Sequence, residues 1–163
     1  MLIVDVDGVL TDGSITLDSH GIESKTFNAS DGSGFKFLQR AGLKCAIISG
    51  RKSEAVEHRA TELGIYDVYQ GAKNKIDAYN EILAKYDLKH EEICYVGDDL
   101  VDIPVMRKVG FPVAVANAAA EVKEIADYIT NTPGGKGAAR EVIEKIIKSQ
   151  GKWDEIMVRY FKN

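Results

Sequence analysis

The chain has 163 residues, of which 45% are hydrophobic and 28% charged, and 21 basic against 25 acidic side chains give a net charge of -4. This length predicts a single domain, residues 1–163, with a hydrophobic core of its own. The sequence carries no basic stripe of the kind that binds nucleic acid, and no apolar run long enough to span a membrane.

The cysteines and the first residues bear on the compartment. The chain opens on apolar residues as far as Asp5, without the basic segment that begins a signal peptide. Cys45 and Cys94 each lie inside an apolar run, so we expect two buried, reduced thiols. Together these features predict a cytoplasmic protein.

Short apolar runs of strand length alternate along the chain with longer segments of helical spacing. In chain order, the expected strands are 2–6, 45–48, 68–70, 93–96, 113–115 and 128–130. Helical spacing of apolar residues predicts helices that include 35–41, 55–63, 76–86, 105–109 and 142–147. This alternation predicts an α/β fold, a Rossmann-like three-layer α/β/α arrangement with a mainly parallel sheet. In such sheets ligands bind at the carboxyl ends of the strands.

Two segments depart from this alternation. Residues 14–17 and 24–28, joined by the polar link 18–21, predict a β-hairpin (about 14–28) that projects from the first strand-to-helix connection. Because an isolated two-stranded ribbon is marginal in water, we expect the hairpin to pack against another surface, for which a neighbouring subunit is one candidate. The C-terminal tail, about 151–163, contains aromatic residues that we interpret as packing anchors.

Acidic and hydroxyl side chains follow three of the expected strands. Asp5 and Asp7 close the first strand, residues 49–51 (Ser-Gly-Arg) follow the second, and Asp98 follows the fourth, with Asp102 four residues further on. Carboxylates that converge at one edge of the sheet repel one another unless a cation lies between them. Magnesium prefers such oxygen ligands, although Asp102 could instead serve only as a helix cap.

A carboxylate beside magnesium can attack phosphorus, and a second one can protonate the leaving oxygen. The segment Asp5-Val-Asp7-Gly resembles the first motif of the haloacid dehalogenase superfamily; residues 49–51, Lys75 and residues 97–102 resemble the other three, in the same order. The resemblance implies that Asp5 is the nucleophile and Asp7 the general acid and base. It further implies that Mg²⁺ binds Asp5, Asp98 and the backbone carbonyl of Asp7.

The remaining motif residues take supporting roles by the same resemblance. Ser49 would donate a hydrogen bond to the phosphoryl oxygens, and Lys75 would place a compact positive charge beside the phosphate and the nucleophile. Asp99 and Asp102 would orient the metal's water ligands and Lys75. The gaps between the motifs leave no room for a cap domain, so the chain is expected to be a capless member. Such an enzyme either acts on macromolecular phosphates or takes its lid from a neighbouring subunit, and the projecting hairpin favours the second.

A closer resemblance covers nearly the whole chain. Stretches that include 27–32, 48–51, 69–75, 95–99, 104–110, 134–141 and 150–153 are similar to the 3-deoxy-D-manno-octulosonate 8-phosphate phosphatases, the capless tetrameric enzymes of lipopolysaccharide sugar synthesis. This resemblance implies a homotetramer in which the tail of one subunit reaches a neighbour's active site. It implies substrate contacts at Asn28, Ala29, Ser30, Asp31, Gly32, Lys36, Arg51, Arg59 and Lys75.

Three alternatives remain open. Relatives that act on nonulosonate 9-phosphates also have a small polar residue at the position of Ser30, but they tend to have Glu where this chain has Arg51. We give Arg51 more weight, and so favour the octulosonate phosphate, because a charge reversal beside the substrate changes specificity more than one shortened side chain does. Arg59 and Arg140 could simply pair with surface carboxylates. A phosphoaspartate receiver uses a similar sheet, but it needs its acceptor aspartate after the third strand, where this chain has the segment 69–71, Tyr-Gln-Gly.

Overall fold

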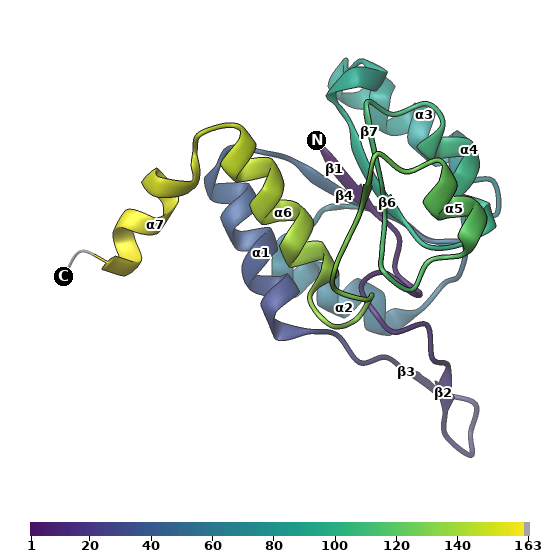
Figure 1. Cartoon of the computed structure of the whole chain (residues 1–163). Helices are drawn as coiled ribbons and strands as arrows, with labels where there is room; N and C mark the ends of the chain where they lie inside the picture. Colours follow the sequence, from purple (N-terminus) through teal and green to yellow (C-terminus); the bar gives the residue numbers. More distant parts are fainter. Residues whose placement is uncertain (162–163) are drawn as a thin grey trace.

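The computed structural model describes residues 1–161 and contains one six-stranded parallel sheet (Figure 1). The strand order is β5-β4-β1-β6-β7-β8. The strands are β1 (Leu2–Val4), β4 (Cys45–Ile48), β5 (Asp67–Tyr69), β6 (Cys94–Gly97), β7 (Phe111–Ala114) and β8 (Tyr128–Ile129). The separate β2 (Thr16–Leu17) and β3 (Glu23–Ser24) pair as an antiparallel hairpin that extends from the body of the protein.

Helices cover both faces of the sheet (Figure 1). One face carries α1 (Ala29–Arg40), α2 (Glu54–Leu63) and α6 (Ala138–Ser149), and the other carries α3 (Lys75–Tyr86), α4 (Ile103–Met106) and α5 (Ala120–Glu124). Two short 3-10 helices, η1 (His90–Glu92) and η2 (Leu100–Asp102), flank β6. The last helix, α7 (Trp153–Phe161), extends beyond α6. No helix within residues 1–161 is long and apolar enough to cross a membrane.

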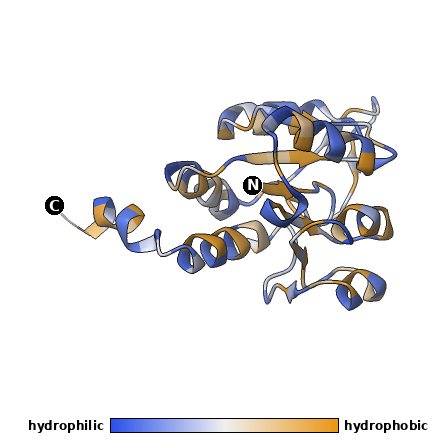
Figure 2. Cartoon of the chain, turned by 90° about the horizontal axis from the view of Figure 1, so that it is seen from above, coloured by the Kyte–Doolittle hydropathy of each residue, from blue (hydrophilic) through white to orange (hydrophobic). Residues whose placement is uncertain are grey.

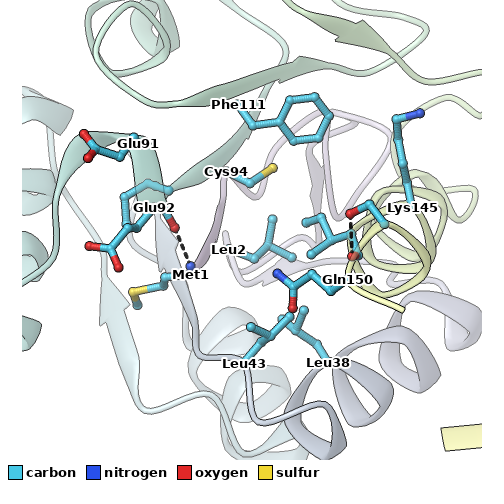
Figure 3. Close-up of a pocket in the computed structure, with 13 residues that line it drawn as sticks. Met1, Leu2, Leu38, Leu43, Glu91, Glu92, Cys94, Phe111, Lys145 and Gln150 are labelled. Carbon is cyan, nitrogen blue, oxygen red and sulfur yellow. Dashed lines mark hydrogen bonds between the residues drawn. The ribbon is translucent and has the colours of Figure 1, made fainter. Parts of the chain in front are cut away.

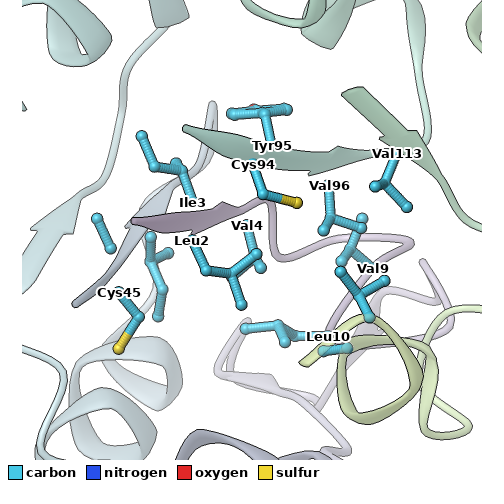
Figure 4. Packing of buried hydrophobic residues seen from close by; sticks show 14 of the residues in the cluster. Leu2, Ile3, Val4, Val9, Leu10, Cys45, Cys94, Tyr95, Val96 and Val113 are labelled. Carbon is cyan, nitrogen blue, oxygen red and sulfur yellow. The ribbon is translucent and has the colours of Figure 1, made fainter. Parts of the chain in front are cut away.

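The central strands are continuous apolar runs because both of their faces are covered. Leu2, Ile3 and Val4 of β1 are fully buried, and Ile3 lies in register between Ala46 and Tyr95 of the flanking strands. Figure 4 shows the side chains of β1 and β6 packed against the loop that follows β1. In Figure 2 the strands are mostly hydrophobic in colour, and the helices show both colours, as expected for elements that turn one side to a core.

Local sequence explains where the helices begin and how closely they pack. Asn28 caps α1 by accepting a hydrogen bond from the backbone N–H of Ser30 at 2.8 Å. Gly64 ends α2 in the left-handed conformation, with φ of 71°. Gly34 lets α1 approach α6, since a Cβ built there would lie 3.1 Å from the Cα of Arg140.

The structure confirms the α/β class, the parallel sheet and the projecting hairpin, with differences at the boundaries. β1 ends at Val4 rather than at residue 6, because the chain turns into the loop that carries Asp5 and Asp7. The hairpin strands are shorter than expected, with two residues each. The sequence patterns did not predict α5 or α7, and the last two residues of the predicted tail, 162–163, lie outside the described residues.

Candidate active site

The first acidic loop and the loop after β6 meet at the carboxyl edge of the sheet. Val4 pairs with Val96 in the parallel ladder, and the N–H of Asp5 continues it by donating to Val96 O at 3.1 Å. Asp5 and Asp98 therefore leave adjacent strands side by side. Gly8 permits their approach, because it has φ of 93° and a Cβ built there would lie 1.9 Å from Asp98 Oδ2.

Lys75, the first residue of α3, brings its ammonium into this cluster. Its Nζ lies 2.8 Å from Asp5 Oδ1 and 2.7 Å from Asp102 Oδ1, and the side chain is almost completely buried. The hydroxyl of Tyr95 donates to the same oxygen of Asp102 at 2.6 Å. A buried lysine is stable only when it is paired in this way, so the position of the cation is well defined.

Asp102 is held on both of its carboxylate oxygens. Lys75 and Tyr95 contact Oδ1, while the backbone N–H groups of Asp98 and Asp99 donate to Oδ2 at 3.0 and 3.2 Å. These bonds make Asp102 more than a helix cap: it joins Lys75 to the loop that carries Asp98. Asp99 is exposed, and its Oδ1 accepts from the N–H of Leu100 at 2.8 Å.

The electrostatics of the cluster fit a divalent cation. One carboxylate oxygen each from Asp5, Asp98 and Asp102 lies within 4.8 Å of the others. Asp98 Oδ1 is buried and has no hydrogen-bond partner within residues 1–161. Burial, reinforced by the charges of Asp5 and Asp102, raises the pKa of Asp98 to about 8, and burial raises the pKa of Asp5 to about 6 in spite of Lys75. Lys75 is one cation against three carboxylates, and such a cluster of hard oxygen donors suits Mg²⁺.

Asp7 lies within a second set of charges, which the sequence patterns did not reveal. The ammonium of Lys25, just after β3, contacts Asp7 Oδ1 and lies 3.0 Å from Glu23 Oε1. Arg51 pairs with Glu23 Oε2, and its Nε lies 3.7 Å from Asp7 Oδ2. The Lys25 ammonium lowers the pKa of Glu23 to about 2, which outweighs the effect of burial. The available signal was the spacing of Glu23 and Lys25, which places both on one face of a strand.

Ser49 lies at the end of β4 in the position expected from the second motif. The side chain is buried, and its Oγ accepts a hydrogen bond from the backbone N–H of Arg51 at 3.3 Å. The carbonyl of Ser49 accepts from the N–H of Ala72 at 3.0 Å, which ties the loop after β4 to the loop that leads to Lys75. The structure thus brings the four motif segments to one edge of the sheet.

The predicted substrate segment at residues 28–32 mainly joins helices. Ala29 and Ser30 are exposed in the first turn of α1, and the hydroxyl of Ser30 donates to Asn28 Oδ1. Asp31 is buried, and its Oδ1 accepts from the N–H of Arg140 at 2.8 Å, at the start of α6. Burial raises the pKa of Asp31 to about 6. Gly32 makes room for Arg59, because a Cβ built there would lie 2.6 Å from its NH2 nitrogen.

The structure does not bring three further cations to the carboxylate cluster. Lys36 donates to Leu63 O at 3.0 Å and so binds the C-terminus of α2. Arg59 pairs with Glu62 at 2.7 Å and also donates to Asn28 O at 3.3 Å. Arg140 pairs with Glu144 at 2.6 Å. Both arginines thus form the carboxylate pairs that the alternative interpretation expected.

A separate pocket of about 380 Å³ lies at the opposite edge of the sheet, where β1, β6 and β7 begin (Figure 3). Its wall includes Leu2, Cys94 and Phe111, with Lys145 of α6 and Gln150 directly after that helix. The motif residues lie at the other ends of the strands and, among the residues that the structure describes, none of them lines this pocket. The carboxylate cluster and this pocket therefore lie at opposite ends of the strands.

Comparison with known proteins agrees with the geometry. The sequence model of the haloacid dehalogenase-like hydrolase family matches residues 59–142. A 3-deoxy-D-manno-octulosonate 8-phosphate phosphatase of Salmonella typhi is 48% identical over 155 residues, which cover 95% of this chain and 82% of that protein.

Two solved structures of such phosphatases are also similar. The Moraxella catarrhalis enzyme, in complex with a magnesium ion, a phosphate ion and 3-deoxy-D-manno-octulosonate, has a TM-score of 0.95 and 40% identity, covering 98% of this chain and 91% of that one. The Yersinia pestis enzyme has a TM-score of 0.92 and 45% identity, covering 94% and 83%.

Proposed function

Because this chain belongs to the haloacid dehalogenase-like hydrolases, we propose that it is a magnesium-dependent phosphatase that hydrolyses 3-deoxy-D-manno-octulosonate 8-phosphate to the free sugar acid and phosphate. The observation that carries the proposal is the convergence of Asp5, Asp98 and buried Lys75 at the carboxyl edge of β1 and β6. The chemistry would proceed through a phosphorylated aspartate.

In the first step a carboxylate oxygen of Asp5 attacks phosphorus, and the bond between phosphorus and the sugar oxygen breaks. Asp7 gives its proton to that leaving oxygen, so the sugar departs as a neutral alcohol. In the second step Asp7 takes a proton from water, whose oxygen attacks the phosphorus of the aspartyl phosphate. This step releases phosphate and regenerates the carboxylate of Asp5.

The remaining residues bind and orient. Asp5, Asp98 and the backbone carbonyl of Asp7 would hold Mg²⁺, which supplies positive charge against the repulsion between a carboxylate nucleophile and a phosphate. Lys75 adds a fixed charge beside Asp5, and Asp102 keeps Lys75 in place. Ser49 would donate its hydroxyl proton to a phosphoryl oxygen, and Asp99 would orient water at the metal.

The substrate assignment rests on charge as well as on the relatives. The side chain of Arg51 is 46% exposed beside Asp7, so its guanidinium can turn toward a carboxylate or a phosphate. The segment of Asn28, Ala29, Ser30, Asp31 and Gly32, with Lys36 and Arg59, would shape the wall of the sugar site. Of these, only Ser30 favours a nonulosonate 9-phosphate.

Phosphate release from a substrate panel tests this proposal. The panel holds the octulosonate 8-phosphate, two nonulosonate 9-phosphates, hexose phosphates and an aryl phosphate, each with Mg²⁺ and with Asp5→Asn as the inactive control. We expect the octulosonate phosphate to be preferred. Preference for a nonulosonate phosphate would transfer the assignment to that sugar, and a fully active Asp5→Asn would overturn the mechanism.

We further propose that the chain works as a homotetramer in the cytoplasm, with residues 1–163 as one catalytic domain. Both cysteines are free and buried, as suits a reducing compartment. Three apolar side chains of the hairpin, Ile15, Leu17 and Ile22, are 54%, 58% and 65% exposed, which favours burial against another subunit. α7 extends beyond α6 on the side away from the hairpin (Figure 1), which favours contact with a neighbour's active site rather than with its own.

Light scattering of the Leu17→Lys/Ile22→Lys variant tests the assembly. We expect the wild-type chain to be a tetramer and the variant to dissociate with loss of turnover. Tyr66→Lys is the matched control, because Tyr66 is 89% exposed near the start of β5, at the other edge of the sheet. A fully active monomer would disprove the shared lid.

A further inference from the structure

Four side chains of alternating charge, Asp7, Lys25, Glu23 and Arg51, form a closed ring next to the nucleophile; we call them the charge ring. Lys25 contacts both Asp7 Oδ1 and Glu23 Oε1. Its contact with Glu23 Oε1 is an ion pair of 3.0 Å without hydrogen-bond geometry. Arg51 bridges Glu23 Oε2 and, at 3.7 Å, Asp7 Oδ2. Each carboxylate of the ring thus contacts two cations, one through each oxygen.

Burial distinguishes the two cations. The side chain of Lys25 is 1% exposed, whereas that of Arg51 is 46% exposed. A buried ammonium that loses its partners carries a large desolvation cost, so Lys25 stays with Asp7. Arg51 pairs closely with Glu23 but contacts Asp7 only at 3.7 Å, and its side chain is half-exposed. Asp7 Oδ1 therefore has the close contact with a buried cation, and Asp7 Oδ2 has the looser contact with an exposed one.

Resting on the phosphatase activity proposed above, we infer that Lys25 is a positioning residue for proton transfer: it holds Asp7 Oδ1 so that Oδ2 faces the leaving oxygen. As the bond between phosphorus and the leaving oxygen breaks, the proton on Asp7 Oδ2 moves to that oxygen and Asp7 becomes a carboxylate. The electrons of the broken bond remain on the leaving oxygen, which departs protonated. Glu23 keeps Lys25 at the required distance.

The inference also assigns the hairpin a role in the reaction. Glu23 belongs to β3 and Lys25 follows it directly, while Asp7 lies in the loop after β1. The second hairpin strand therefore delivers the ammonium that orients Asp7. A shift of the hairpin relative to the sheet would move Lys25 and misplace the proton donor, even if Asp5, Asp98 and Lys75 kept their places.

A series of phenyl phosphates with leaving groups of graded acidity tests the inference. An acidic phenol departs without a proton, whereas a weakly acidic one needs the proton from Asp7. We expect Lys25→Met to lower kcat/KM about 100-fold for the least acidic leaving group and by less than about 3-fold for the most acidic. The dependence of kcat/KM on the acidity of the leaving group should therefore be steeper in Lys25→Met than in the wild-type chain. Because kcat/KM ends at bond cleavage, the second step does not mask the effect.

Two further variants separate positioning from general damage. Lys25→Arg retains the positive charge and should restore the shallow wild-type dependence at least in part. Lys85→Met is the control, since Lys85 also pairs with an aspartate, Asp67, but is half-exposed and lies at the opposite edge of the sheet. Lys85→Met should leave the dependence of kcat/KM on leaving-group acidity as it is in the wild-type chain. An equal loss for all leaving groups in Lys25→Met would overturn the inference.

Folding and activity are checked separately. Repulsion between Asp7 and Glu23 is the reason for which Lys25→Met would not fold. In that case the double variant Lys25→Met/Glu23→Gln, which lacks the charges of Lys25 and Glu23, is measured in the same series. Circular dichroism confirms the fold before any rate is compared. A wild-type chain that releases no phosphate from any substrate would refute the proposed function itself, whereas an unchanged dependence in folded, active variants would refute only the role of Lys25.

Discussion

The ammonium of Lys75 lies 2.8 Å from Asp5 Oδ1, and both side chains are almost completely buried. The two residues come from different elements, Lys75 from the start of α3 and Asp5 from the loop after β1. A charged pair in this environment is favourable only because Asp102 and Tyr95 complete the hydrogen bonding. The pair therefore depends on the fold, and it places a positive charge beside Asp5, the proposed nucleophile.

Replacement of Lys75 tests this relationship. Lys75→Met removes the charge but keeps an unbranched side chain of similar length, and we expect kcat to fall by about 10² to 10³, as for other fixed electrostatic groups. The Mg²⁺ affinity should change less, because Asp98 is untouched. Turnover and metal titration measure the two effects. A variant with the wild-type kcat would show that the pair is only structural.

Removal of the metal should make stability depend on pH. Without metal the folded pKa of Asp98 is about 8 and that of Asp5 about 6, both above the usual value near 3.8. A carboxyl with a raised folded pKa stabilises the fold while it is protonated, and this contribution is lost as the pH rises through the folded pKa. The loss runs from the unfolded to the folded pKa, so the melting temperature of the metal-free protein should fall between about pH 4 and 8 and then level off.

Magnesium should oppose that fall. The cation binds ionised carboxylates, so its effect on the melting temperature should be larger near pH 8.5 than near pH 6. Thermal melts with chelator and with Mg²⁺, at each pH, measure the difference. Asp98→Asn is the control and should remove most of both effects. An effect of Mg²⁺ that is independent of pH would contradict the assignment of Asp98.

Gly8 is expected to tolerate no side chain. A Cβ at this position would lie 1.9 Å from Asp98 Oδ2, and φ is 93°. Gly8→Ala should therefore displace Asp98, lower Mg²⁺ affinity and turnover at least about 10-fold, and destabilise the fold by about 1 to 3 kcal/mol. Gly21→Ala is the matched control: φ there is 77°, but no atom lies within 4 Å of the added Cβ. Equal metal binding in the two variants would disprove the steric argument.

Asp31 should act mainly through the start of α6. Its Oδ1 accepts from the N–H of Arg140, so Asp31→Ala should lower the free energy of unfolding by about 1 to 2 kcal/mol, as a lost helix cap does. Asp31→Asn keeps an acceptor oxygen and should recover most of that loss. Denaturant unfolding measures both. A raised KM in Asp31→Asn with unchanged stability would instead support its predicted contact with substrate.

Much of the fold follows from local pattern. The expected strands at 2–6, 45–48 and 93–96 agree with β1, β4 and β6 to within two residues at each end, because buried parallel strands are uninterrupted apolar runs. The short helix α5 and the helix α7 were not predicted. α7 is stabilised by tertiary contact, with Trp153 packed edge-on against Phe37 of α1 at 5.9 Å between ring centroids.

The sequence by itself determined the family, the parallel α/β sheet and the identity of the motif residues, since motif order and strand ends are properties of the chain. The family prediction is confirmed by the matching family model and relatives, while the individual residue roles stay predictions. Only the tertiary structure decided which charges meet. It placed Lys25 on Asp7 and assigned Asp31 and Lys36 to helix ends, because ion pairs and caps between distant segments depend on side-chain directions that no spacing encodes.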